Sequence, residues 1–325
     1  MKIIHFVTGL ALISATTAKA ETRFQNGVTL DGYIELGQVH TLNSNNGDHN
    51  QSLLRADIDL SYRPAPTGYG ITLGIDGYGG SIGQEVAVHP ALEYSTSLGT
   101  VSLGAPRSVV DRGYLPSFTL GNSSYASLEY YSLYRSAVSI FNLEHSNIPY
   151  GLRYDGALGQ TKIGFSAHKL NNRRRGSIRG DSYSLALSRH IDTKTLLGRL
   201  HLSAARERVN YDNGVYHTGH HLGVETVNGP TTLGVLYKEE GVAFQYQTLV
   251  AYVNYTFKDN LKLTASFGRL DNPYSSLHSF SAAFNYYGLG LEYTLKSNAY
   301  LKASFTDTSN NLNGPSGEIM MGWKF

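Results

Sequence analysis

Apolar and polar side chains alternate along most of this chain, and that alternation restricts its fold more than any other feature. In the segment 28–37, Leu30 and Ile34 share one face, whereas Glu35 lies on the opposite face. A period of two residues is that of a β-strand. The same pattern recurs as far as the C-terminus and gives about 16 strands, so the chain is predicted to be all-β.

Some of these strands carry charge along one whole face. In the segment 54–62, Arg55 and Asp57 lie opposite the apolar residues. This pattern fits either a water-soluble sandwich or a barrel with a wet interior. The repetition of this half-polar pattern in strand after strand favours the barrel. A sandwich of this length needs fully apolar central strands, and we find none. Short turns and longer connections alternate, as in transmembrane antiparallel barrels, and about 16 strands leave an aqueous channel.

One connection is far longer than the others and runs from Arg107 to about Pro149, just before the strand that begins at Tyr150. Loops longer than about 12 to 15 residues are uncommon in compact domains and usually have a function. The aromatic side chains of this loop need a surface to pack against, and the interior of the barrel offers one. We therefore predict that this third loop folds into the lumen and narrows it. Its aromatic residues are Tyr114, Phe118, Tyr125, Tyr130, Tyr131, Tyr134 and Phe141.

The first twenty residues have the features of a signal peptide. Lys2 precedes the apolar run 3–12, and Ala18-Lys19-Ala20 has the small-x-small form of a cleavage site. The alternative, an N-terminal core helix, would be isolated in a chain of strands. We expect residues 1–20 to be removed and residues 21–325 to form a single barrel domain.

The composition excludes several classes of function. Removal of the signal peptide takes away Lys2 and Lys19, so the 27 basic residues become 25 and equal the 25 acids. A nucleic-acid-binding protein is disfavoured, because binding to the phosphate backbone needs a clustered excess of Lys and Arg. The chain has no cysteine, which excludes disulfides and thiolate metal sites. No Gly-x-Ser-x-Gly or His-Glu-x-x-His motif occurs, so no enzyme and no cofactor are predicted. The oxygen-rich segment 43–48 leaves a loop calcium site open.

The chain ends on an apolar stripe. An exposed stripe of this kind is an aggregation hazard in water, whereas a strand that closes a transmembrane barrel turns it towards lipid. We therefore predict a membrane-facing closing strand formed by Ile319, Met321, Trp323 and Phe325.

Taken in order, these features resemble those of general diffusion porins of the Gram-negative outer membrane, in particular the trimeric alphaproteobacterial kind. The resemblance rests on the signal peptide, Gly32-Tyr33, the turn and strand at 98–107, the segment 153–156 and the terminal Phe325. It implies a 16-stranded homotrimeric barrel whose third loop forms an eyelet. The partners it implies are outer-membrane lipid, lipopolysaccharide, and small hydrophilic solutes and ions, and the location is the outer membrane, reached through the periplasm.

In such porins, acids of the third loop face bases on the barrel wall. The resemblance implies constriction residues Asp111, Glu129, Glu144, Arg112 and Arg135 on the loop, and Arg55, Asp57, Arg153 and Glu35 on the wall. Three acids against two bases make this loop nearly neutral, so we predict modest ion selectivity at most.

Plainer interpretations stay open. In these, Asp111 and Glu129 are solvated loop carboxylates, Arg55 pairs with a carboxylate of its own strand, and the arginines of 173–179 are solvated rather than bound to lipid phosphate. Two functional alternatives also remain. One is a substrate-selective channel, for example for sugars that stack on the aromatic loop. The other is a barrel without a channel, an adhesin or an enzyme.

Overall fold

The computed structural model describes residues 21–42, 48–80, 83–111, 113–116, 121, 123–124, 136–138, 148–172, 178–193, 198–239, 247–258, 260–271, 283–309 and 314–325. The predicted signal peptide therefore lies outside the described residues. Within the described ranges, no helix is long and apolar enough to cross a membrane.

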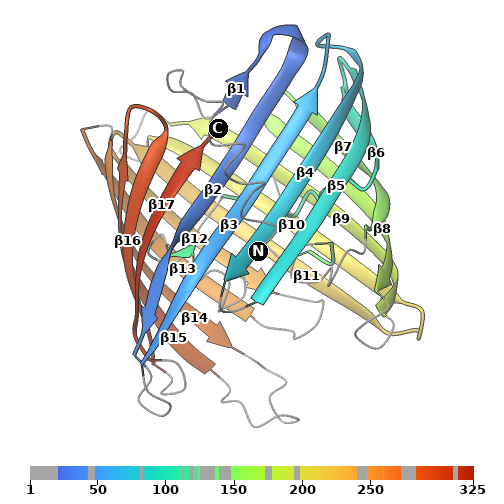
Figure 1. Ribbon diagram of the computed structural model, residues 1–325. Coiled ribbons are helices and arrows are strands. Elements are labelled where there is room, and N and C mark those ends of the chain that lie inside the picture. Colours follow the sequence, from blue (N-terminus) through green and yellow to red (C-terminus); the bar gives the residue numbers. More distant parts are fainter. Residues whose placement is uncertain are drawn as a thin grey trace.

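The alternation seen in the sequence becomes a series of antiparallel strands (Figure 1). A short 3-10 turn, η1 (Gln25–Gly27), follows the first strand. The strands are β1 (Glu21–Arg23), β2 (Val28–Thr41), β3 (His49–Tyr62), β4 (Gly68–Gly80), β5 (Gly83–Thr96), β6 (Gly99–Gly104), β7 (Tyr150–Leu158), β8 (Thr161–Asn172), β9 (Ile178–Asp192), β10 (Arg199–Tyr211), β11 (Tyr216–Asn228), β12 (Thr231–Glu239), β13 (Gln247–Phe257), β14 (Leu261–Asp271), β15 (Ala283–Thr294), β16 (Ala299–Thr308) and β17 (Ser316–Lys324).

These strands close into a barrel. The sheet has 17 strands, and all except the three-residue β1 form a ring of 16 in which β17 pairs with β2. Figure 1 shows this closure where the red β17 lies beside the blue β2. The predicted number of strands and their antiparallel order are confirmed.

The first and last described strands meet at this seam. β1 pairs with residues 29–31 of β2, and β17 pairs with residues 33–41 of the same strand. The Phe325 backbone N–H donates to the Gly32 carbonyl at 2.9 Å. Ile319 and Met321 are exposed as predicted, but Trp323 is half-buried and Phe325 is buried. The terminal aromatic thus packs at the seam, because β1 occupies the next stretch of β2.

The connections divide the barrel into two ends. At one end, here called the short-turn end, β5 and β6 are joined by Ser97 and Leu98; the other end, the long-loop end, includes the connection 105–149. From the sequence, a glycine-rich loop is expected between a strand at 69–78 and a strand at 90–98. This expectation is wrong in extent, because the β4–β5 ladder continues to the pair Gly80 and Gly83. Glycine has no side chain that could display the alternation, so a run of glycines hides a strand.

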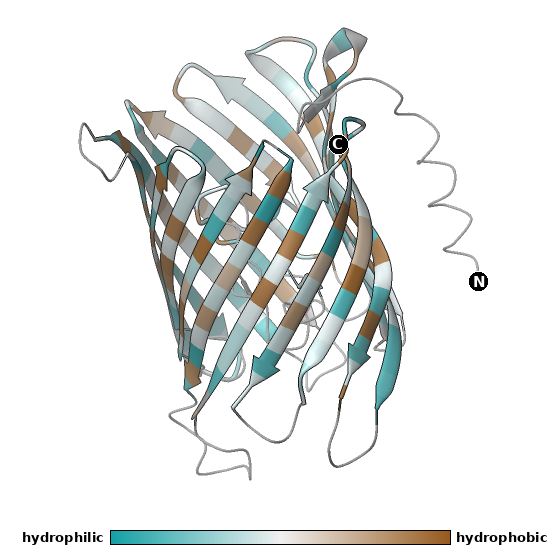
Figure 2. Ribbon diagram, turned by 90° about the vertical axis from the view of Figure 1, so that its left-hand side faces the viewer, coloured by the Kyte–Doolittle hydropathy of each residue, from teal (hydrophilic) through white to brown (hydrophobic). Residues whose placement is uncertain are grey.

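Hydrophilic and hydrophobic residues alternate along the strands (Figure 2), and burial assigns them to the two faces of the barrel. On β2 and β17, the apolar residues Leu36 and Ile319 are 53% and 70% exposed, whereas Glu35 and Glu318 on the opposite face are 2% and 4% exposed. A closed barrel has no protein on its outside, so the exposed apolar residues define the outward face and the buried polar residues define the inward face.

Three inward tyrosines lie over glycines of the neighbouring strand. Tyr286 on β15 stands directly opposite Gly268 on β14, and a methyl group at Gly268 would overlap the Tyr286 ring. Glycine leaves the backbone open for the aromatic ring, which covers it. The other two pairs are Tyr252 with Gly234 and Tyr300 with Gly322.

Gly268→Ala is therefore expected to destabilise the folded barrel by about 1–3 kcal/mol, the usual effect of overpacking. The matched control is Gly317→Ala, because a Cβ at Gly317 meets open space. Urea unfolding in lipid vesicles measures both variants. Equal midpoints for the two would show that the Tyr286 ring does not need the glycine.

Candidate functional site

The long connection, residues 105–149 between β6 and β7, begins with a buried arginine. The Arg107 guanidinium donates to Asp76 at 2.6 Å, to Asp57 at 3.2 Å and to Asp59. It also donates to the Ile58 carbonyl at 3.3 Å. Arg107 is 7% exposed. It therefore ties the start of the connection to the inward face of β3 and β4.

The next residues pack on β8 and β9. The Ser108 hydroxyl lies 3.3 Å from the Ser166 hydroxyl and 3.2 Å from the Ser184 hydroxyl. Val109 and Val110 are fully buried in one cluster that includes Ala186 of β9 and Ala205 of β10. This part of the connection is held by both hydrogen bonds and apolar contact.

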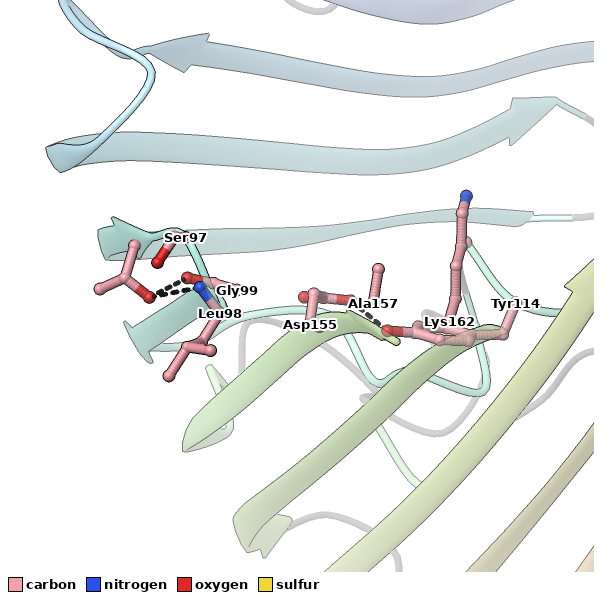
Figure 3. Close-up of a pocket in the computed structure, with 10 residues that line it drawn as sticks. Ser97, Leu98, Gly99, Tyr114, Asp155, Ala157 and Lys162 are labelled. Atoms are coloured by element: carbon pink, nitrogen blue, oxygen red, sulfur yellow. Dashed lines mark hydrogen bonds between the residues drawn. The ribbon is translucent and has the colours of Figure 1, made fainter. Parts of the chain in front are cut away.

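Tyr114 fixes the connection near the short-turn end. Its hydroxyl donates to the Asp155 carboxylate at 3.0 Å and to the Ile163 carbonyl at 2.9 Å. Figure 3 shows the Tyr114 and Asp155 side chains meeting beside a cavity, with Lys162 on the same wall. The Tyr114 ring lies on Gly164, where any Cβ would collide with it.

The middle of the connection contacts the opposite wall. The Gly121 N–H donates to the Ser266 hydroxyl of β14 at 3.0 Å. The Ser123 hydroxyl and the Ser124 N–H donate to the Glu318 carboxylate of β17 at 2.8 Å and 2.9 Å. The Ser124 hydroxyl also donates to Glu35 of β2. Two buried carboxylates, one on β2 and one on β17, thus accept the hydrogen bonds of this part of the connection.

The connection then returns to β10. The Ala137 N–H donates to both oxygens of Glu207 at 3.1 Å, and the Ser182 hydroxyl donates to the same carboxylate at 2.6 Å. The Ser136 N–H donates to Asp111 at 3.1 Å. Burial raises the pKa of the Asp111 carboxyl above its ordinary value. Asp111 and Ser136 therefore hold the outgoing and returning parts of the connection side by side.

Charged groups on the inward face occur in two clusters. Asp57, Asp59 and Asp76 surround Arg107 on β3 and β4. On β14 to β17, Lys324 and Lys262 lie 2.5 Å and 3.6 Å from the carboxylate of Glu292. Nearby, Lys302 pairs with Glu35. The first cluster has three acids around one base, whereas the second has three lysines and, with Glu318 of β17, three carboxylates.

The predicted wall residues all lie on the inward face, whereas most of the predicted loop residues lie outside the described ranges. Glu35 and Asp57 belong to the contacts above. Arg153 donates to Asp155 at 2.6 Å and to the Arg107 carbonyl at 3.3 Å. The Arg55 guanidinium lies 5.4 Å from the centre of the Tyr33 ring. Glu129, Glu144, Arg112 and Arg135 lie outside the described residues, and Asp111 contacts Ser136.

Sequence reasoning missed several residues of this site, among them Arg107, Glu207, Lys262, Lys302 and Lys324. The inward acids Asp57 and Asp59 could have indicated a basic partner such as Arg107, because carboxylates on an inward face need a base. A calcium site was left open in the segment 43–48, of which residues 43–47 lie outside the described residues. Within the described ranges, no three His, Asp or Glu side chains are placed to hold a metal ion.

Comparison with known proteins identifies relatives of this chain. A family model described as Gram-negative porin matches residues 7–313. A mutant of the Rh. blastica porin has 15% identity and a TM-score of 0.63, over 92% of this chain and 100% of that chain. OmpF of Salmonella typhi, solved with daunomycin, has 14% identity and a TM-score of 0.62, over 94% of this chain and 100% of that chain. No curated protein matches significantly.

Proposed function

Because this chain belongs to the Gram-negative porin family and forms an outer-membrane channel for passive diffusion, we propose that its long connection constricts the lumen and controls which solutes pass. The family and the fold point to a channel rather than an enzyme. The solutes would be small, hydrophilic molecules and ions. The constriction would combine the described anchors of the connection with the two charged clusters of the wall.

The positions of the anchors carry this proposal. Ser108 contacts β9, and Ser123 contacts β17. In a ring of 16 strands, β9 and β17 are eight strands apart, so they lie opposite each other across the barrel. All of these partners are on the inward face. A connection that projected away from the barrel would not reach both walls.

The charges of the site support weak selectivity. Most inward acids have a basic partner within ion-pair distance, for example Asp76 with Arg107 and Glu292 with Lys324. Paired charges screen one another, so ions of either sign meet a modest barrier.

We expect a reversal potential close to zero in planar bilayers with asymmetric salt, because acids and bases balance along the lumen. Permeability ratios far from unity would contradict this balance.

Conductance blocked by micromolar to millimolar sugar would instead favour a sugar-selective channel. Within the described residues, the Tyr114 ring is buried and offers no stacking face for a sugar. The absence of conductance steps would contradict a channel function altogether.

We further propose that the mature chain begins at Glu21, crosses the periplasm and assembles as a homotrimer. The predicted cleavage site after Ala20 supports the first point. The broad apolar outward face supports insertion into lipid. Mass spectrometry of the purified protein would give both the N-terminus and the number of subunits.

A further inference from the structure

Two histidines face each other inside the barrel, on neighbouring strands near the short-turn end. His190 of β9 stands directly opposite His201 of β10 in the antiparallel register. Both side chains point inward, because they continue the alternation that includes the buried Ser188 and Ser203. The ring centres lie 4.3 Å apart, and the rings are 13° from parallel. Neither histidine belongs to the described anchors or ion pairs of the lumen.

The pair lines the short-turn mouth of the channel. It lies beside the connection 193–198, which joins β9 to β10. In outer-membrane barrels the short turns face the periplasm. His190 is exposed, and His201 is half-buried. The two imidazoles are therefore open to water and to ions that enter from the periplasm.

The ring nitrogens of this pair are available to a ligand. Within the described ranges, neither imidazole has a hydrogen-bond partner, and each ring contacts the other. Other histidines of the barrel use a ring nitrogen within the protein. His168 Nε2 lies 2.8 Å from the Pro106 carbonyl oxygen, and His40 Nδ1 lies 2.8 Å from the Asn50 amide oxygen.

Two neutral imidazoles side by side are ligands for a divalent transition metal. Imidazole suits Zn²⁺, Cu²⁺ and Ni²⁺, and a Zn²⁺–nitrogen bond is about 2.0–2.1 Å long. Two nitrogens on one ion are then about 3 Å apart, so rings with centres 4.3 Å apart need only turn towards each other. Exposed side chains rotate readily. Water completes the coordination, and no group of three protein ligands is needed, in agreement with the absence of such a group among the described residues.

Charged residues around the pair act on a bound cation in opposite directions. Glu225 of β11 stands opposite His201 on its other side. Lys162 of β8, drawn in Figure 3, acts electrostatically on His201. Arg199 and Asp192, next to the connection, form an ion pair at 3.1 Å. The Glu225 carboxylate attracts a dication and the Lys162 ammonium repels it.

We propose that His190 and His201 bind one divalent transition-metal ion at the periplasmic mouth. The ion adds two positive charges to the lumen there, so the metal-bound channel favours anions more than the metal-free channel does. The inference is independent of the proposed constriction, because the pair lies outside the long connection. Metal binding measured without a current can fail while the constriction stands, and the reverse also holds.

Electron paramagnetic resonance of Cu²⁺, titrated into the folded protein in detergent, tests this site. The protein is purified without a histidine tag, and heat-modifiable migration establishes that each variant folds. The tightest Cu²⁺ of the native protein is expected to show two nitrogen ligands. The variants His190→Gln and His201→Gln should each weaken its binding at least about tenfold, since loss of an outer partner alone costs that much. The double variant should lose the two-nitrogen signal, and Lys162→Gln should bind Cu²⁺ more tightly.

The matched control is His40→Gln, because His40 is exposed like His190 but its Nδ1 already contacts Asn50. It is expected to leave the Cu²⁺ affinity and the two-nitrogen signal unchanged. Equal affinity of the double variant or a signal from one nitrogen ligand would overturn the proposal. So would weaker binding by Lys162→Gln, because the mouth would then hold an anion.

In planar bilayers, added Zn²⁺ should move the reversal potential of the native channel towards anion preference. The double variant His190→Gln and His201→Gln should show no such shift. An equal shift in both channels would place the ion elsewhere and contradict the assignment to these two histidines.

Discussion

Replacing Arg107 with glutamine is expected to destabilise the folded barrel by about 3–5 kcal/mol, the usual cost of breaking a buried ion pair. Three carboxylates, Asp57, Asp59 and Asp76, converge on this one guanidinium. Without it, three like charges on neighbouring strands repel one another. The start of the long connection would also lose its tie to β3 and β4.

Urea unfolding in lipid vesicles, followed by the fluorescence of the single tryptophan, measures this effect. Arg63→Gln is the matched control, because Arg63 pairs with Glu93 at 2.6 Å but is 38% exposed. Exposed pairs contribute about 0–1 kcal/mol, so this variant should unfold almost like the native protein. Similar midpoints for both variants would show that Arg107 does not hold the carboxylates together. The unfolding midpoint of Arg107→Lys should lie between those of Arg107→Gln and Arg63→Gln, because lysine keeps the positive charge but lacks the planar guanidinium.

The strands and their faces were predictable because the rule behind them is local. Leu30 and Ile34 on one side of β2 and Glu35 on the other follow from a period of two residues. The inward direction of Arg55, Asp57 and Arg153 follows in the same way. The strand 83–89 was missed because the flanking glycines interrupt the visible alternation.

The contacts within the site were not predictable, because they join residues far apart in the chain. Glu35 meets Lys302 and Ser124, and Glu207 meets Ala137. Such pairs depend on how the ring closes and on where the long connection crosses it. Asp111 illustrates the limit: the sequence marks it as a loop acid, but its hydrogen bonds to Ser136 appear only in three dimensions. Its part in the constriction stays a prediction.

Shortening the long connection is expected to widen the channel. Residues 117–135 would be deleted, and Pro116 would be joined to Ser136 through a short glycine-serine linker. Ser136 donates to Asp111 at 3.1 Å, and the five residues from Asp111 to Pro116 reach at most about 18 Å, so a glycine-serine linker of about six residues spans the gap. The variant keeps every barrel strand and the anchors at Arg107, Ser108 and Ala137. It loses the contacts of Gly121, Ser123 and Ser124 with the far wall.

Single-channel conductance of this deletion variant in planar bilayers tests most directly whether a segment inside the barrel limits flow. Heat-modifiable migration on gels would first establish that the variant folds. A 16-stranded barrel without an internal segment leaves a wide aqueous lumen, so conductance should rise by at least about twofold, and larger polyethylene glycols should enter. A folded variant with unchanged conductance and unchanged polymer exclusion would contradict a constriction formed by residues 107–149.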